Sequence, residues 1–145
     1  MHTVADILAS KATPADVETI GPDESVLDAA RHMNERHIGA LMVREKDALA
    51  GIVTERDILT KLVAGKRDPE QTRVRDIMTD RVVCCTPSTT LDELRNVMRE
   101  KRIRHMPVLD GTKLVGMVSI GDLNFAENTT LNETIRYLEE FLSHG

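Results

Sequence analysis

The segment Gly51-Ile52-Val53-Thr54-Glu55-Arg56-Asp57 recurs as Gly116-Met117-Val118-Ser119-Ile120-Gly121-Asp122, at an offset of 65 residues. The same offset holds without a gap back to Pro22 and Pro87. Self-similarity of this length indicates two copies of one structural unit in tandem. Because one copy has too little apolar sequence for a stable core of its own, the two are expected to pack on each other around a pseudo-two-fold axis.

A shorter segment precedes each copy. VADIL at residues 4–8 matches VRDIM at residues 74–78, at an offset of 70. The chain is therefore divided into a first repeat with its prelude, a linker, a second repeat and a C-terminal helix. The predicted boundaries are 1–66, 67–73, 74–128 and 129–145.

Each copy is predicted to fold in the order β-α-β-β-α. The first helix follows Ser25 and Thr90, which are N-cap residue types, because apolar residues recur behind them at helical spacing. Short apolar runs separated by turn residues then predict one hairpin per copy. Hairpin strands are expected at residues 40–43, 49–53, 106–109 and 114–118, and second helices from Thr54 to about Val63 and from Ser119 to about Ala126.

The tail carries apolar residues on one face of a further predicted helix between Thr130 and Leu142. These residues are Leu131, Ile135, Leu138 and Phe141 or Leu142. Packing of this face on the repeats is expected. A contact with a second copy of the chain is the alternative.

Composition excludes several classes of function. The 145 residues carry a net charge of −5 and include one tyrosine, two phenylalanines and no tryptophan, which disfavours nucleic-acid binding. The sequence has no apolar run long enough to cross a membrane, and we expect a cytoplasmic protein. Cys84 and Cys85 fit a buried strand in a reducing compartment, with a vicinal redox pair as the alternative.

No catalytic or metal-binding constellation is present. The five histidines show no ligand spacing with cysteines or carboxylates, and no nucleophile motif or Gly-rich phosphate loop occurs. The repeated motif itself is typical of a capping box, in which a hydroxyl and a carboxylate three residues later close a helix start. It also suits a nucleotide, because the carboxylate can accept both hydroxyls of a ribose, the helix N-terminus attracts phosphate, and Gly51 and Gly116 let a ligand approach the backbone.

From about Thr3 to Asn128 the chain closely resembles a tandem pair of CBS domains, also called a Bateman module. The resemblance rests on both preludes, the helices after Pro22 and Pro87, HIGALMV, RIRHMPVLDG and the two motifs GIVTERD and GMVSIGD. It implies an α/β (α+β) fold of two pseudo-symmetric repeats packed through their sheets, followed by the C-terminal helix. It also implies adenosine-containing ligands (AMP, ADP, ATP, NAD or S-adenosylmethionine) in clefts between the repeats.

The resemblance also implies roles for individual residues. The ribose and phosphate ligands would be Thr54, Asp57, Ser119, Asp122, Arg56, Arg104 and His105. The adenine contacts would be Thr19, Ile20, Ile38, Gly39, Ala40, Val83, Cys84, Cys85, Ile103, Met106 and Pro107. Each motif is expected to face the other repeat, so Asp57 would lie near residues 83–85 and Asp122 near residues 19–20. Because Arg104 and His105 stand where the first repeat has Gly39 and Ala40, the two clefts are not equivalent.

The leading prediction is a non-enzymatic adenine-nucleotide sensor that needs no catalytic cofactor and no metal. It would be a homodimer and would report occupancy, and hence energy state, to an unidentified regulated protein, with no nucleic acid or membrane partner. The alternative is a constitutive scaffold protein whose clefts stay empty and whose motifs only cap helices.

Overall fold

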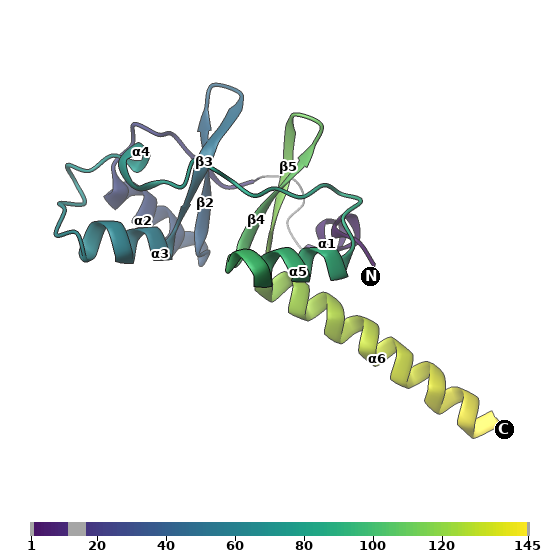
Figure 1. Ribbon diagram of the computed structural model, residues 1–145. Helices are drawn as coiled ribbons and strands as arrows, with labels where there is room; N and C mark the ends of the chain where they lie inside the picture. Colours follow the sequence, from purple (N-terminus) through teal and green to yellow (C-terminus); the bar gives the residue numbers. More distant parts are fainter. Residues whose placement is uncertain (1, 12–16, 145) are drawn as a thin grey trace. The chain divides into compact units, whose positions relative to one another are not determined.

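The computed structural model describes residues 2–11 and 17–144, which form two compact units (Figure 1). The contiguous unit is Val17–Val83, and the split unit combines Met1–Asp16 with Cys84–Gly145. Both mix helices with a small sheet, so the predicted α+β class is confirmed. The predicted divisions 1–66 and 74–128 follow the sequence repeats, whereas each compact unit contains the prelude of the other repeat.

The contiguous unit is a three-stranded sheet with helices. Its elements are β1 (Thr19–Ile20), α2 (Val26–Arg36), β2 (Ala40–Glu45), β3 (Ala48–Thr54), α3 (Glu55–Asp57), the π-helix η1 (Ile58–Val63) and α4 (Val74–Ile77). β2 is parallel to β1 and antiparallel to β3, in the order β1-β2-β3. Apolar residues of β2, β3, α2 and α4 form one buried cluster. The predicted β-α-β-β-α order is confirmed in this unit.

The split unit is built around a two-stranded hairpin. Its elements are α1 (Val4–Ser10), α5 (Leu91–Lys101), β4 (His105–Asp110), β5 (Lys113–Ser119) and α6 (Ile120–His144). Gly111 lies in the hairpin turn with φ +63°, a conformation that glycine adopts without strain. The predicted first strand of this repeat is reduced to a single parallel bridge between Cys85 and Val108.

Pro107 explains why this strand is short. In the contiguous unit the Met42 amide donates to the Glu18 carbonyl at 3.2 Å and extends the pairing next to β1. Pro107 takes the place of Met42 in the second repeat and has no amide hydrogen to donate. The bonds on either side of Cys85 are kept, from the Cys85 amide to the Pro107 carbonyl and from the Leu109 amide to the Cys85 carbonyl, both 2.9 Å.

The two prelude helices pack against the start of the other repeat's first long helix. In the split unit the Val4 amide donates to the Thr89 carbonyl and the Leu91 amide to the His2 carbonyl. The contiguous unit repeats this pattern with α4, where the Val74 amide donates to the Glu24 carbonyl and the Val26 amide to the Thr72 carbonyl. Both helices also supply core residues, because Val4, Ile7, Val74 and Ile77 are at most 2% exposed.

The C-terminal part of the chain differs from its prediction. The sequence predicts a helix ending near Ala126 and a separate one from Thr130, but α6 is one continuous helix of 25 residues. The threonines between the two predicted helices do not interrupt it, since Thr129 and Thr130 donate to the carbonyls of Phe125 and Ala126 one turn earlier. The tail also does not pack on its repeat, because every residue from 131 to 143 is exposed.

Within residues 2–11 and 17–144, no helix combines the length and the apolar character that a membrane span requires.

Candidate functional site

Both motifs form capping boxes at a junction between a strand and a helix. At the end of β3, the Asp57 amide donates to the Thr54 hydroxyl at 3.2 Å, and the Thr54 amide donates to Asp57 Oδ2 at 3.0 Å. At the end of β5, the Asp122 amide donates to Ser119 Oγ at 3.1 Å, and the Ser119 amide donates to Asp122 Oδ2 at 2.9 Å. The capping interpretation of the motif is therefore confirmed in both repeats.

Each capping carboxylate also contacts a lysine. Lys61 Nζ, on η1, lies 3.0 Å from Asp57 Oδ1 and donates to the Ile77 carbonyl at the end of α4. Lys11 Nζ, at the end of α1, lies 2.9 Å from Asp122 Oδ2 and donates to the Met117 carbonyl of β5. In each unit a lysine therefore links the motif to the prelude helix packed beside it.

The Asp57 carboxylate makes two more polar contacts than that of Asp122. The Thr79 hydroxyl, just after α4, donates to Asp57 Oδ1 at 3.3 Å, and the Thr54 hydroxyl donates to Oδ2 at 3.1 Å. The Asp57 side chain is 10% exposed and that of Asp122 is 28% exposed. The first motif is therefore the more enclosed of the two.

The residues predicted to bind phosphate lie at the same two junctions. Arg56 and Arg104 are exposed, and His105 lies opposite Ser119 in the β4–β5 ladder, where Ala40 lies opposite Thr54 in the first repeat. The structure thus brings His105 beside the second motif. The first amide of each following helix is already bonded, from Glu55 to the Gly39 carbonyl and from Ile120 to the Arg104 carbonyl. This leaves fewer free amides for a phosphate than an uncapped helix would offer.

The residues predicted to contact adenine fall into two groups by exposure. Four of these residues are at most 6% exposed: Ile20, Ala40, Cys85 and Met106. Pro107 is also buried, and the partly exposed members are Thr19, Ile38, Gly39, Val83, Cys84 and Ile103. The predicted assembly of one cleft from both repeats involves both units and stays a prediction.

Burial makes both cysteine thiols weaker acids than an exposed thiol. Burial raises the pKa of the Cys84 thiol, and burial together with the neighbouring Cys84 raises the pKa of Cys85 to about 11. The Cys85 thiol also donates to the Pro107 carbonyl at 3.6 Å. Because thiolates are the reactive form of cysteine, this environment disfavours redox chemistry at Cys85.

The two motif glycines are packed against the prelude segments. A Cβ atom at Gly51 would lie 2.6 Å from the Thr79 carbonyl oxygen, and one at Gly116 would lie 2.6 Å from Leu8 Cδ2. The space over each glycine is therefore filled by the chain itself, whereas the sequence suggested that a ligand would use it.

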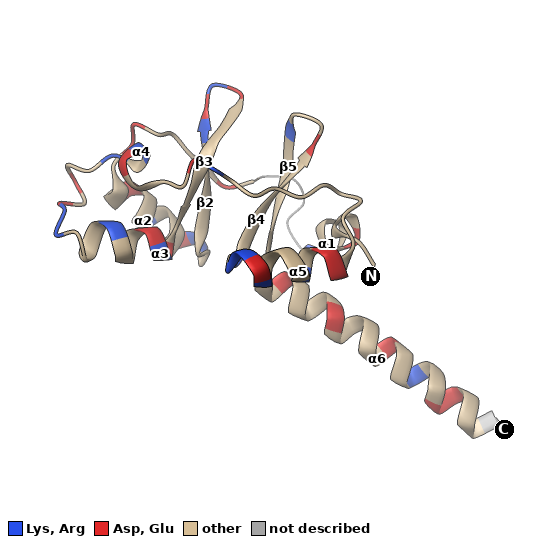
Figure 2. Cartoon of the chain, in the orientation of Figure 1, with Lys and Arg blue, Asp and Glu red and all other residues tan. Residues whose placement is uncertain are grey.

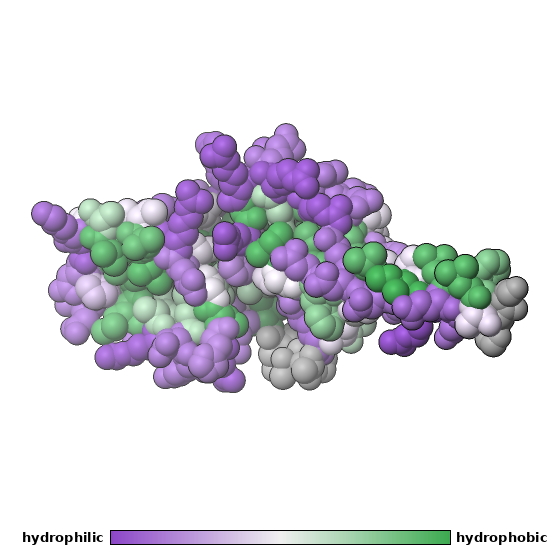
Figure 3. Space-filling view, turned by 90° about the horizontal axis from the view of Figure 1, so that it is seen from below, coloured by the Kyte–Doolittle hydropathy of each residue, from purple (hydrophilic) through white to green (hydrophobic). Residues whose placement is uncertain are grey.

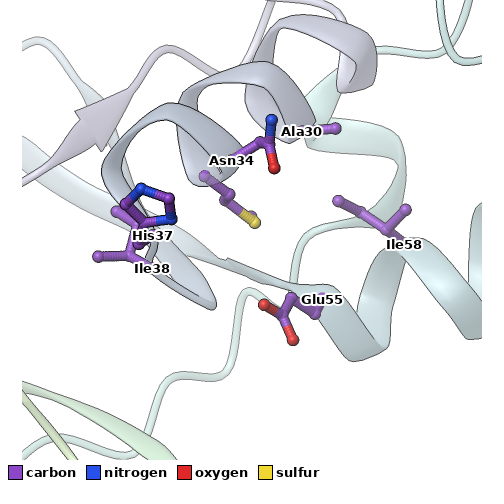
Figure 4. A pocket seen from close by; sticks show the side chains of 7 residues that line it. Ala30, Asn34, His37, Ile38, Glu55 and Ile58 are labelled. Atoms are coloured by element: carbon purple, nitrogen blue, oxygen red, sulfur yellow. The ribbon is translucent and has the colours of Figure 1, made fainter.

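A pocket of about 500 Å³ lies between α2 and the α3–η1 segment of the contiguous unit (Figure 4). Its lining residues are Ala30, Met33, Asn34, His37, Ile38, Glu55 and Ile58. Of the predicted adenine residues it includes Ile38. Glu55 of the first motif lines this pocket, but Thr54 and Asp57, which form the capping box, are not among its lining residues.

Three neighbours of the motifs were not predicted from the sequence: Lys11, Lys61 and Thr79. Lys61 was detectable, because it follows Asp57 by four residues and such pairs meet on one helix face. Lys11 is 106 residues from its partner Met117, and no local pattern predicts that contact. Among the residues that the structure describes, no three His, Cys, Asp or Glu side chains are grouped closely enough to hold a metal ion.

Comparison with known proteins extends the sequence resemblance. The chain is 37% identical over 150 residues to the mitochondrial CBS domain-containing protein CBSX3 of Arabidopsis thaliana, covering 99% of this chain and 73% of that protein. A solved structure with CBS domains from Burkholderia ambifaria MC40-6 has a TM-score of 0.83 and 46% identity, covering 86% of this chain and 92% of that one. The hexameric CBS-CP12 protein from bloom-forming cyanobacteria has a TM-score of 0.74 and 32% identity, covering 85% of this chain and 70% of that one.

The family assignment follows from these matches together with the duplicated architecture. The model of the CBS domain matches twice, at residues 4–64 and 74–129, which are the two repeats with their preludes. The chain belongs to the CBS-domain family, in which it forms a tandem pair.

Proposed function

We propose that this chain is a non-enzymatic regulatory module that binds an adenosine-containing ligand and signals its occupancy to a protein partner. The observation that carries the proposal is the duplicated junction, at which a hydroxyl and a carboxylate are held together between a strand and a helix start. A carboxylate fixed in this way can accept hydrogen bonds from the two hydroxyls of a ribose when one of its oxygens is not already occupied. The candidate ligands are AMP, ADP, ATP, NAD and S-adenosylmethionine.

The connections around the motifs supply a route for signalling. Lys11 and Lys61 join each motif carboxylate to a prelude helix, and each prelude helix comes from the other sequence repeat. A ligand that competes for a carboxylate changes the free energy of these links. A ligand shifts the equilibrium between two conformations only by the difference in its affinity for them. Signalling therefore requires that the contact between lysine and carboxylate differs between the two conformations.

The first test is the melting temperature of the purified chain, alone and with each of the five compounds. A ligand that binds the native state stabilises it by mass action, by about 2.7 kcal/mol at a free concentration of 100 Kd. A selective rise with one compound supports the proposal and identifies the ligand class. No rise with any compound, together with no nucleotide released on denaturation, contradicts it and favours the constitutive scaffold.

The same proposal includes self-association through α6. Six large apolar side chains in its second half are between 45% and 76% exposed: Leu131, Ile135, Tyr137, Leu138, Phe141 and Leu142. Figure 3 shows apolar residues gathered along this part of the helix, and acidic residues recur along it in Figure 2. Leu131, Ile135, Leu138 and Leu142 follow the alternating spacing of four and three residues that pairs two helices.

The size of this face fits a second copy of the chain. If each of the six side chains exposes on the order of 100 Å², the face totals roughly 600 Å², near the ~800 Å² that one partner contributes to a standard interface. Two-fold homodimers are the most common soluble assemblies. A related CBS protein is hexameric, which shows that association occurs among such chains.

A further inference from the structure

The carboxylate of Asp57 has no capacity left for a ligand. Its Oδ2 accepts from the Thr54 amide at 3.0 Å and the Thr54 hydroxyl at 3.1 Å. Its Oδ1 accepts from the Thr79 hydroxyl at 3.3 Å and contacts Lys61 Nζ at 3.0 Å. A carboxylate has about four acceptor sites, so all of them are used, and the side chain is only 10% exposed.

Asp122 has one carboxylate oxygen that no described residue contacts. Its Oδ2 accepts from the Ser119 amide at 2.9 Å and contacts Lys11 Nζ at 2.9 Å. Oδ1 accepts no hydrogen bond from any residue in the described ranges, 2–11 and 17–144, and the side chain is 28% exposed. The Ser119 hydroxyl accepts a hydrogen bond from the Asp122 amide, but it donates to no atom of the described residues. The Thr54 hydroxyl, in contrast, donates to Asp57.

This difference between the two carboxylates originates in the sequence. At the offset of 65 residues Lys61 corresponds to Ala126, and at the prelude offset of 70 residues Thr79 corresponds to Ala9. Both side chains that occupy Asp57 Oδ1 are therefore alanine in the positions that would serve Asp122. Lys11 supplies a cation from a different position and contacts the other oxygen, so Oδ1 remains open.

We propose that the two motifs have diverged, so that Asp122 is the ribose-binding carboxylate and Asp57 is a structural one. This inference rests on the proposed function and deepens it. Oδ1 of Asp122 accepts hydrogen bonds from the 2′ and 3′ hydroxyls of the ligand. The Ser119 hydroxyl donates a hydrogen bond to a ribose or phosphate oxygen. Asp57 instead ties η1 to the segment after α4 through Lys61 and Thr79. Each chain then binds one ribose through a carboxylate.

Titration calorimetry with AMP and with 2′,3′-dideoxy-AMP tests this division. The wild type is expected to bind one AMP per chain and to bind the dideoxy analogue at least about tenfold more weakly, since hydrogen bonds to a charged group are lost. Asp122→Asn is expected to weaken AMP binding by a similar factor and to abolish most of the preference for AMP. Its melting temperature without ligand should stay near that of the wild type.

Asp57→Asn is the matched variant in the other repeat. It is expected to keep the AMP affinity within about twofold and the full preference over the dideoxy analogue, while melting at a lower temperature. If it does not fold, Thr79→Val removes one donor of the same cluster with less disturbance, and the same result is expected.

The possible results separate this inference from the proposed function. Two AMP per chain, or loss of the preference for the ribose hydroxyls in Asp57→Asn or Thr79→Val, overturns the division of roles alone. Failure of the wild type to bind AMP overturns the assignment of Asp122 to adenine nucleotides. The absence of a melting shift with all five candidate ligands, together with no nucleotide released on denaturation, overturns the proposed function as well.

Discussion

Gly51 and Gly116 hold equivalent places in the two repeats but face different obstacles. An added Cβ at Gly51 would meet the Thr79 backbone carbonyl, which also accepts a hydrogen bond from the Ile52 amide, whereas one at Gly116 would meet the end of the Leu8 side chain. A side chain can rotate aside, but a hydrogen-bonded carbonyl cannot. Gly51→Ala is therefore expected to destabilise the protein by about 1–3 kcal/mol, and Gly116→Ala by less. Urea unfolding of the two variants checks this order, and equal losses would contradict it.

Cys85 is expected to be unreactive in the native protein. Its pKa of about 11 leaves almost no thiolate at neutral pH. Iodoacetamide at pH 7.5 should leave it unmodified in the folded chain and alkylate it after unfolding, as mass spectrometry would show. Because the pKa of Cys85 in the folded chain lies above the ordinary thiol value of 9.0, Cys85 loses its proton at a lower pH in the unfolded chain, so stability should fall as the pH rises from about 9 to 11. Stoichiometric alkylation of native Cys85 at pH 7.5 would restore the redox alternative.

At this scale the sequence predicted the local contacts and missed the distant ones. The bonds between Thr54 and Asp57 and between Ser119 and Asp122 follow from a spacing of three residues, which any helix start brings together. The third and fourth partners of Asp57 come from η1 and from the segment after α4, and Lys11 reaches Asp122 from the other end of the chain. The two motifs therefore look alike in sequence, although among the residues that the structure describes only Asp122 has a carboxylate oxygen that accepts no hydrogen bond.

Among the elements, α6 carries the exposed apolar face through which we propose that two copies of the chain associate. Replacing Leu138 with glutamate places a charge in the apolar face of both copies in a two-fold dimer. Because burial of one leucine contributes about 1.5–3 kcal/mol, Leu138→Glu is expected to weaken dimerisation at least tenfold. Asn132→Glu, which adds the same charge to the polar face, is the matched control and should leave the dimer intact. Sedimentation velocity over a concentration series measures both; a wild type that is monomeric throughout, or equal effects of the two variants, would contradict this role of α6.

The sequence predicted most elements, and two of its departures from the structure have local causes. Periodicity located α2 and α5 because each helix has buried apolar residues recurring at a spacing of three or four residues. The strand at Cys85 is shorter than predicted because Pro107 lacks the amide that Met42 uses. α6 is longer than predicted because Asn128, Thr129 and Thr130 resemble a break, yet no glycine or proline follows Gly121 before the helix ends. Propensity alone did not show that threonine hydroxyls would bond back into the helix.

At the scale of the whole chain, the compact units are offset from the sequence repeats. VADIL and VRDIM precede their repeats in sequence, so a reading along the chain assigns each prelude to the repeat that follows it. Their helices instead bond to the other repeat: α1 with residues 87–91 and α4 with residues 22–26. This exchange of prelude helices between the repeats depends on contacts between residues far apart in sequence, which the repeat pattern does not predict. The repeat that a prelude precedes in sequence is therefore not the unit in which its helix packs, and an experiment has to determine the second.

Two fragments of nearly equal length make this test. Residues 17–83 contain every element of the contiguous unit, whereas residues 1–66 follow the sequence repeat and lack α4, whose Val74 and Ile77 are at most 1% exposed. Units of this size are marginally stable, so the loss of two core side chains and the bonds to Glu24 and Thr72 should be decisive. Fragment 17–83 is expected to show the larger helical circular dichroism signal and the more cooperative melt. In the full chain, Val74→Ala should accelerate amide exchange within residues 17–83, and Val4→Ala within residues 84–126. A fragment 1–66 that melts as cooperatively as 17–83, with both variants acting on the repeat that follows them in sequence, would contradict the exchange.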